Sequence, residues 1–239
     1  MEEIIKESDA LYDAYKIDDA YAVLEKYGSG TDPELLWRLA RVLCEKGKMT
    51  EDKDQRKKFI YEAYEMIQKA VANEGEKGCF GAHKWFAILL NYIGEYEGTK
   101  ERIKKASDIK LHLEKALDLN ENDPTTWHIL GAWHFTFADM GTCTRMVAKT
   151  IFGTPPSSTY DEAMKCFEKA ESISPNFYSK NLWYMAEIYD RLGKKEEAIQ
   201  LYKKAFKMPV LSADDKEVHE TCIYVFAYQL WCTLFGYTE

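Results

Sequence analysis

The 239-residue sequence predicts an all-α protein, a solenoid of antiparallel helical hairpins closed by a C-terminal capping helix. Three observations predict this fold class. Apolar residues recur at helical spacing along most of the chain. Short breaks rich in Gly, Pro, Asn and Asp separate those stretches. A repeat-like pattern spans residues 124–175 and sets the register for the rest of the chain.

The pattern in residues 124–175 is that of two helices of one repeat. Trp127 is followed by Leu130-Gly131, and the second part carries Ala163, Phe167 and Ala170 before Pro175. A large residue, Leu-Gly, then Ala, an aromatic and Ala is typical of a tetratricopeptide-type repeat of about 34 residues. This one is longer, because residues 138–158 intervene. We therefore predict an interrupted third repeat with an extra short helix at about 142–152.

The breaks place the other elements in order. Asp32-Pro33 supplies an N-cap and a first helical residue, and Ser212 with Asp215 resembles a capping box at the start of the last helix. Residues 1–28 are predicted to form a separate acidic N-terminal hairpin, and residues 29–239 the repeat domain. The predicted hairpins cover residues 33–73, 79–122, 124–175 and 177–209, followed by a C-terminal helix at 212–235.

The charge of the chain is uneven. The net charge is −8, and residues 1–34 contain ten acids and three lysines. The acidity therefore belongs mainly to the N-terminal hairpin, and the rest is nearly neutral. Nucleic-acid-binding domains usually carry a clear basic excess, so we expect no nucleic-acid partner.

The sequence contains no pattern that indicates a metal site, a leader or a membrane span. The six cysteines form no CxxC pair and lie at no zinc-ligand spacing from a histidine, so we expect free thiols, no metal and no cofactor. The N-terminus lacks the basic start and apolar core of a signal peptide, and no apolar run approaches 18 residues. The expected location is the cytoplasm.

Motifs of catalysis are also missing from the sequence. It holds no GxSxG, GxxxxGK[ST], GxGxxG or HExxH segment. His128 and His134 are six residues apart, which does not place them on one face of a helix for a shared metal. We therefore expect that the protein is not an enzyme.

The first helices of the hairpins are predicted to line the concave side of the solenoid. The position that faces this side holds a flat ring in each of the four hairpins. Such rings are common in recognition surfaces, because they bury a large area at low entropic cost. The alternative is that the last helix fills the groove and the rings are core. The residues expected to bind a partner in the groove are Trp37, Arg41, Phe86, His128, Lys180, Trp183 and Glu187.

Basic residues cluster instead on the second helices, at the convex side or its edge. Runs of this kind are usually ordinary solvated helix faces. The functional alternative is attraction to an acidic polymer or membrane surface, which weakens steeply with salt. The candidate clusters are Arg56, Lys57 and Lys58, then Lys100, Arg102, Lys104 and Lys105, and finally Lys203 and Lys204.

The last predicted helix is apolar most of the way round, with Tyr224, Tyr228 and Trp231 among its large side chains. A helix of that composition is usually buried on more than one side. One interpretation is that it folds back across the array. The other is that it forms a homodimer or another partner surface.

Three segments carry a resemblance to a known family. Residues 82–87 (AHKWFA), residues 94–98 (GEYEG) and residues 154–182 closely resemble the regulator of microtubule dynamics family. The similarity covers about residues 30–235, including the interrupted third hairpin. The chain resembles a short, nematode-type member without a membrane anchor.

This resemblance implies a non-enzymatic, microtubule-associated scaffold that acts at the mitotic spindle and spindle poles in chromosome segregation and microtubule dynamics. Its implied partners are microtubules or tubulin, and spindle or kinetochore proteins bound through the groove. Its implied location is the cytoplasm and cytoskeleton. Some relatives are anchored to the mitochondrial outer membrane and bind phospholipid. The alternative function is therefore that of a phospholipid-binding, phospholipid-transfer or organelle-contact protein using the aromatic groove.

Overall fold

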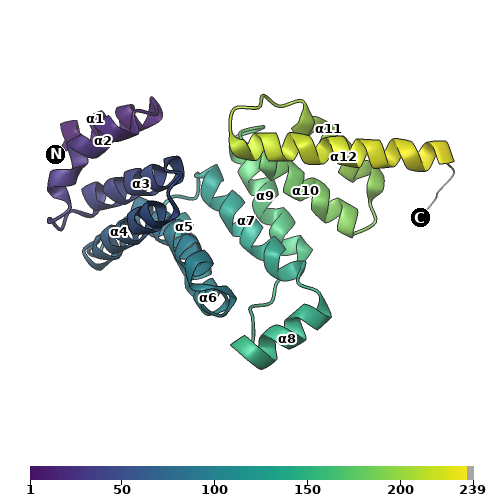
Figure 1. Ribbon diagram of the computed structural model, residues 1–239, viewed down its shortest axis with the longest axis horizontal. Helices are drawn as coiled ribbons and strands as arrows, with labels where there is room; N and C mark the ends of the chain where they lie inside the picture. Colours follow the sequence, from purple (N-terminus) through teal and green to yellow (C-terminus); the bar gives the residue numbers. More distant parts are fainter. Residues whose placement is uncertain (236–239) are drawn as a thin grey trace. The chain divides into compact units, whose positions relative to one another are not determined.

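The computed structural model describes the backbone of residues 1–235, together with the side chains of residues 1–151 and 153–231. Within this part the chain forms twelve α-helices and one short 3-10 helix, Glu25–Tyr27. No helix among the described residues is both long and apolar enough to span a lipid bilayer. The helices, drawn in Figure 1, are α1 Glu2–Asp13, α2 Ile17–Leu24, α3 Pro33–Met49, α4 Lys53–Ala72, α5 Phe80–Glu97, α6 Thr99–Leu119, α7 Pro124–Ala138, α8 Thr142–Phe152, α9 Tyr160–Ile173, α10 Ser179–Arg191, α11 Lys195–Phe206 and α12 Ala213–Phe235.

The helices separate into two compact units. Unit 1 comprises Met1–Asn122 and Met140–Pro156, and unit 2 comprises Asp123–Asp139 and Ser157–Glu239. The boundary expected after residue 28 stays a prediction. In the structure α1 and α2 pack on α3 and lie in unit 1, where Ile17, Ala20 and Leu24 of α2 are buried in the core.

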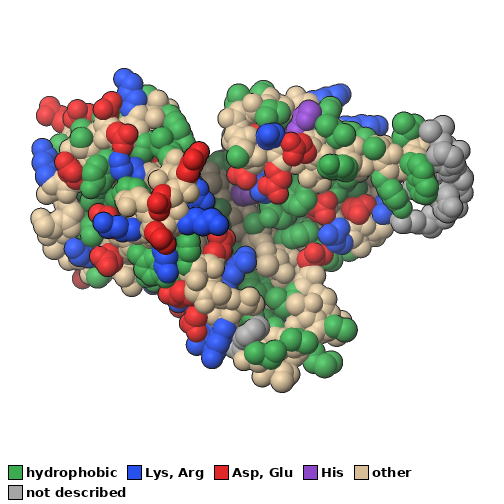
Figure 2. Space-filling view, viewed as in Figure 1, with side chains coloured by type: hydrophobic (Ala, Val, Ile, Leu, Met, Phe, Trp, Pro, Cys, Tyr) green, Lys and Arg blue, Asp and Glu red, His purple; other side chains and the backbone are tan. Residues whose placement is uncertain are grey.

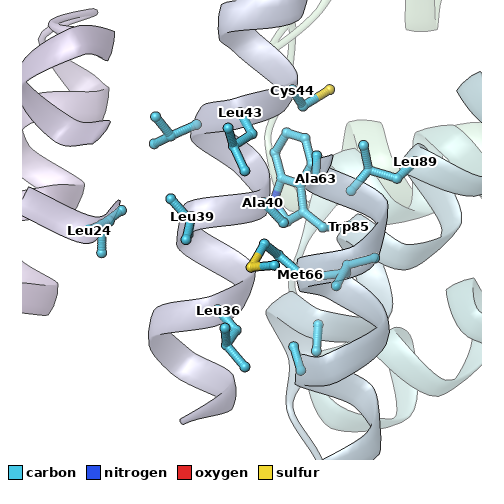
Figure 3. Close-up of a cluster of buried hydrophobic side chains, with 14 of the residues drawn as sticks. Leu24, Leu36, Leu39, Ala40, Leu43, Cys44, Ala63, Met66, Trp85 and Leu89 are labelled. Carbon is cyan, nitrogen blue, oxygen red and sulfur yellow. The ribbon is translucent and has the colours of Figure 1, made fainter. Parts of the chain in front are cut away.

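The core of unit 1 lies where α2, α3, α4 and α5 meet. Leu36, Leu39 and Leu43 of α3 face Ala63 and Met66 of α4, and Leu24 of α2 approaches from the opposite side (Figure 3). Trp85 and Leu89 of α5 lie against the same cluster (Figure 3). The spacing of three and four residues along α3 is the helical periodicity that the sequence displays.

Unit 2 is organised around the interrupted hairpin of α7 and α9, which pack directly on each other. A Cβ atom added at Gly131 of α7 would lie 2.7 Å from Cε1 of Phe167 in α9, so a glycine is needed for this close approach. Phe167 is fully buried and stacks on Tyr184 of α10 at 5.1 Å between ring centroids. The two parts of the repeat pattern in residues 124–175 therefore meet at Gly131 and Phe167.

The local signals at several helix ends are confirmed. The Asp32 side chain accepts hydrogen bonds from the amides of Glu34 and Leu35, and Ser212 with Asp215 forms reciprocal bonds at the start of α12. The α8 helix occupies Thr142–Phe152, the position predicted for it. At the start of α9, Thr159 forms a capping box with Glu162.

The last helix, α12, packs on α10 and α11 of unit 2. Val218 and Cys222 are buried there, and Val225 and Phe226 lie partly buried beside them. Its first turns are held by side chains of α10 and the residue before it: Tyr178 donates to Asp214, and Ser179 donates to Asp215 at 2.6 Å. The interpretation that this helix folds back onto the repeats is therefore correct for the first half of α12.

Candidate functional site

An ion cluster joins α1 to α3 and includes one of the predicted groove residues. Asp9 of α1 accepts hydrogen bonds from Arg38 Nη2 at 2.8 Å and from Arg41 Nη2 at 2.7 Å. Both arginines are buried. Burial would raise the pKa of the Asp9 carboxyl, but hydrogen bonds from Arg38 and Arg41 outweigh it and hold the pKa below its ordinary value. Arg41 is thus enclosed beneath α1, and its predicted role in binding a partner stays a prediction.

Trp37, the first of the predicted rings, is half-buried against α5. Its Nε1 donates to Glu34 Oε2 at 2.9 Å, and the guanidinium of Arg38 lies 4.1 Å from the ring centroid. A Cβ atom at Gly81 would lie 2.3 Å from the indole, so α5 approaches Trp37 through the bare backbone of that glycine. Much of the Trp37 ring is therefore used for packing between α3 and α5.

Phe86 of α5 belongs to a small aromatic and imidazole cluster with α4 and α6. Its ring stacks on His112 at 3.9 Å and tilts against Tyr64 at 5.6 Å. His112 Nδ1 lies 2.8 Å from Nδ1 of His83, and His83 Nε2 lies 3.0 Å from Glu74 Oε2. Phe86, the second ring predicted to line the groove, is thus packed between helices.

The proton positions in this cluster follow from its geometry. A carboxylate only accepts, so His83 donates to Glu74 through Nε2–H, which leaves its Nδ1 as an acceptor for His112 Nδ1–H. The three side chains form a relay, Glu74–His83–His112, with both imidazoles neutral. Burial lowers the pKa of His83, and burial together with the neighbouring His83 lowers the pKa of His112 to about 4.

This relay predicts a pH dependence of stability. Between the ordinary histidine pKa of 6.5 and about 4, the unfolded chain binds protons at His112 that the folded chain does not. Stability should therefore rise with pH across this window, by roughly 1 kcal/mol per pH unit for each neutral histidine. We expect His112→Phe to flatten the plot of urea midpoint against pH between 4.5 and 6.5.

The control is His219→Gln on α12. The two variants remove one histidine each, but only His112 lies in the relay. A flattened plot for His219→Gln, or an unchanged slope for His112→Phe, would contradict the assignment of the pH dependence to the relay.

His128 of α7 lies in the core of unit 2. Its Nδ1 is 3.0 Å from Asn181 Oδ1, and the Asn181 amide in turn donates to the Phe167 carbonyl at 3.1 Å. The ring meets Tyr178 edge-on at 4.8 Å. Burial lowers the pKa of His128 to about 4, against the hydrogen bond with Asn181. His128 is therefore a buried ring of unit 2, and its predicted role in binding a partner stays a prediction.

The three remaining groove candidates, all on α10, also have partners inside unit 2. Lys180 binds Asp214 at 2.9 Å and Glu217 at 2.8 Å, both on α12. Glu187 accepts from the Tyr202 hydroxyl of α11 and pairs with Arg191 at 3.1 Å. Trp183 is half-buried and packs edge-on against Tyr184.

Of the groove candidates in unit 1, the structure brings Trp37 and Arg41 together, with the Arg41 guanidinium 5.0 Å from the Trp37 ring centroid.

The basic clusters lie on α4, α6 and α11, the second helices of their hairpins, and are mostly exposed. Three members form ion pairs with acidic side chains: Lys104 with Glu101 at 2.6 Å, Lys105 with Glu97 at 2.8 Å, and Lys204 with Glu171 at 3.1 Å. The remaining members of the three clusters, all exposed, are Arg56, Lys57 and Lys58 on α4, Lys100 and Arg102 on α6, and Lys203 on α11.

The α8 insert adds an apolar stripe to unit 1. Met146, Val147 and Ile151 are exposed on one face of this helix, and Ala148 is buried. The α8 helix contacts α6, and Figure 2 shows Lys and Arg side chains beside the apolar side chains of the insert. The exposed basic and apolar residues of unit 1 are the strongest candidate surface for a partner.

The next question is which described side chains could hold a metal ion or react as thiols. No three of the described His, Cys, Asp and Glu side chains converge as they would around a metal ion. The cysteines at positions 44, 79, 143, 166 and 222 are free thiols, and only Cys143 of these is exposed. The relay of Glu74, His83 and His112 was not predicted, because its two histidines are 29 residues apart and no local pattern links them.

Comparison with known proteins decides the family. The profile of the family described as regulator of microtubule dynamics protein 1-3 matches residues 4–227. The chain belongs to this family. Family membership was the expectation from residues 82–87 and 154–182, and it is confirmed. The short nematode type and the absence of an anchor stay predictions.

Vertebrate proteins of the family are clearly related to this chain. Regulator of microtubule dynamics protein 1 of Pongo abelii is 41% identical over 219 residues, which cover 91% of this chain and 69% of that protein. The human protein of the same name is 42% identical over 183 residues, 76% of this chain and 58% of its own length. Regulator of microtubule dynamics protein 3 of Xenopus laevis is 33% identical over 188 residues, 79% of this chain and 40% of its own length.

Solved structures confirm the fold of this family member. A tetratricopeptide repeat protein of Thermus thermophilus superposes with a TM-score of 0.62 at 16% identity, covering 93% of this chain and 98% of that one. YrrB, described as a tetratricopeptide repeat protein with an unusual peptide-binding site, gives 0.54 at 15% identity over 94% and 90% of the two chains. At these identities the likeness establishes the all-α repeat fold alone.

Proposed function

We propose that this protein is a non-enzymatic scaffold that binds microtubules and acts at the mitotic spindle and its poles. The support is membership of the regulator of microtubule dynamics family together with a helical-repeat fold of the kind used for protein–protein binding. The observation that carries the proposal is the exposed basic surface on the second helices of unit 1. Binding of spindle or kinetochore proteins through the groove residues, and a role in chromosome segregation, are further parts of the proposal.

Electrostatics support a basic docking surface despite the net charge of −8. Microtubule surfaces are acidic, so attraction requires that local basic charge outweighs the acidic hairpin. One acid of that hairpin, Asp9, is neutralised by Arg38 and Arg41. Lys100 and Arg102 form no ion pair with another described residue, which leaves their charge available for steering a partner. Such attraction falls as salt rises.

We expect the double variant Lys100→Glu/Arg102→Glu to weaken microtubule co-sedimentation roughly tenfold at low salt. These two residues are preferred to Lys104 and Lys105, because reversing the latter would place like charges beside Glu101 and Glu97. The difference from wild type should shrink as salt is added. Circular dichroism should show that the helix content of the variant is unchanged.

The matched control is Lys16→Glu/Lys26→Glu, which changes the net charge equally at two exposed lysines of the N-terminal segment. The control should bind nearly as wild type does. Equal losses in both double variants would show a response to net charge alone. Unchanged pelleting of the α6 variant at low salt would exclude this surface.

The lipid-carrier alternative has weaker support. It requires a column of accessible rings, but Phe86 stacks on His112 and His128 is buried beside Phe167. Extraction of the purified protein followed by mass spectrometry tests it directly. A stoichiometric phospholipid would favour this alternative over the scaffold.

A further inference from the structure

The α12 helix has one face packed on the protein and another that lies in solvent. Val218 and Cys222 are buried against α10 and α11, and the Cys222 thiol contacts the Tyr202 carbonyl at 3.5 Å. At 100° per residue, the opposite side of the helix carries Ile223 and Tyr224. The inner face therefore fixes α12 on unit 2 and determines which residues point outward.

From Ile223 to Trp231 the outer face is strongly apolar. Tyr224 is 76% exposed and Leu230 is 61% exposed. No charged residue occurs between Glu220 and Glu239 in the sequence. Isolated exposed apolar residues are ordinary, but a contiguous group of this size marks an interaction surface. Its other members are Ile223 (48%), Tyr228 (55%) and Trp231 (46%).

The size of this surface suits pairing of two copies. Side chains of this kind expose about 200 Å² each when free, so the stated fractions leave roughly 600 Å² of apolar and aromatic surface on one copy. Two copies would together bury roughly 1,200 Å², the lower end of the range for stable, specific interfaces.

We propose that two copies of this chain associate through the outer faces of α12, related by a two-fold axis. A two-fold interface places the same surface on both sides, so a surface with charge of one sign would repel its copy. The α12 surface from residue 223 to residue 231 carries no charge, and a charged partner would find no complementary group on it. The exposed apolar stripe of α8, by contrast, shares its helix with two basic residues, Arg145 and Lys149, and with no acidic residue. Tyrosine suits the rim, because its hydroxyl stays hydrated while its ring is buried.

The inference is independent of the proposed function, because it concerns unit 2 and self-association only. We expect light scattering of the 239-residue chain to give a mass that rises with concentration toward twice 27.8 kDa and then stays constant. The variant Tyr224→Glu/Leu230→Glu should raise the dissociation constant at least tenfold, because it places four carboxylates in the apolar interface.

A matched control changes two apolar residues of α8 that are exposed to a similar degree. Met146→Glu/Ile151→Glu should associate as wild type does. Circular dichroism should show equal helix content in all variants, and Tyr224→Ser/Leu230→Ser replaces the α12 variant if the glutamates unfold it. A wild-type mass of 27.8 kDa at every concentration, a mass that grows beyond the dimer, or equal loss of association in the α8 control would each overturn the proposal.

Discussion

Replacing Asp9 by Asn is expected to lower the free energy of unfolding by about 3 kcal/mol at neutral pH. The carboxylate is the hydrogen-bond acceptor for Arg38 and Arg41, whose guanidinium groups are buried between α1 and α3. Asn keeps the shape of the side chain but removes the carboxylate that pairs with buried Arg41, and it leaves Arg38 paired with Glu34 alone, at 2.7 Å. The Asp9 side chain is itself 33% exposed, so we take the lower end of the range for broken buried ion pairs.

The same variant has a defined pH signature. Because the folded-state pKa of Asp9 lies below its ordinary value of 3.8, the stabilisation is complete above that value and is lost as the pH falls below it. Urea unfolding curves of wild type and Asp9→Asn should therefore differ at pH 7 and converge in acid. A difference that persists unchanged in acid would contradict a charge-based cause.

Asp13→Asn is the matched control for this experiment. Asp13 ends the same helix and is exposed. Its replacement changes the net charge equally and should alter the free energy of unfolding by less than about 0.5 kcal/mol. A comparable loss in both variants would attribute the effect to the overall charge of the hairpin instead of the cluster with the two arginines.

The second large effect is expected at Phe167. Phe167→Ala should lower the free energy of unfolding by about 3 to 5 kcal/mol, because the fully buried ring leaves a cavity between α7, α9 and α10. Denaturant titration followed by circular dichroism measures it. A loss below about 1 kcal/mol would contradict the central position of this ring in unit 2.

A double-mutant cycle with Gly131 tests the contact itself. Gly131→Ala places a Cβ atom 2.7 Å from the Phe167 ring, so it should destabilise the wild-type protein. In the Phe167→Ala background the methyl group enters the cavity, and the same change should cost less or stabilise. Additive effects of the two substitutions would show that this close approach of α7 and α9 does not determine their packing.

The sequence predicts those parts of the fold that local chemistry determines. The cap at Asp32, the start of α12 and the span of α8 depend on neighbouring residues, and all three agree with the structure. Gly47 shows where local rules fail. A glycine followed by polar residues is typical of a break between helices, but α3 continues through Gly47 to Met49. The reason is tertiary, since a Cβ atom at Gly47 would lie 3.3 Å from Ile60 of α4.

The candidate groove was less predictable. The repeat pattern indicates which residues face the concave side, but it assumes that no other part of the chain covers them. Arg41 occupies such a position but pairs with Asp9, 32 residues earlier in the chain. Lys180 also occupies one and pairs with Asp214, 34 residues later. Pairings at such separations leave no periodic signal in a sequence. The basic clusters were located correctly on exposed second helices, because a run of like charges is a local property that solvent accommodates directly.

The interruption of the third hairpin also has a consequence for how the protein is made. Unit 1 is completed only by Met140–Pro156, and unit 2 begins earlier, at Asp123. A ribosome therefore delivers α7 before the last helix of unit 1 and well before α9, the helix that covers α7. The apolar face of α7 therefore stays without its partner α9 while α8 is synthesised, and exposed apolar surface at this stage of translation favours aggregation. For the same reason, a cut between Asn122 and Asp123 cannot separate two complete units: α8 would remain on the fragment to which it does not belong.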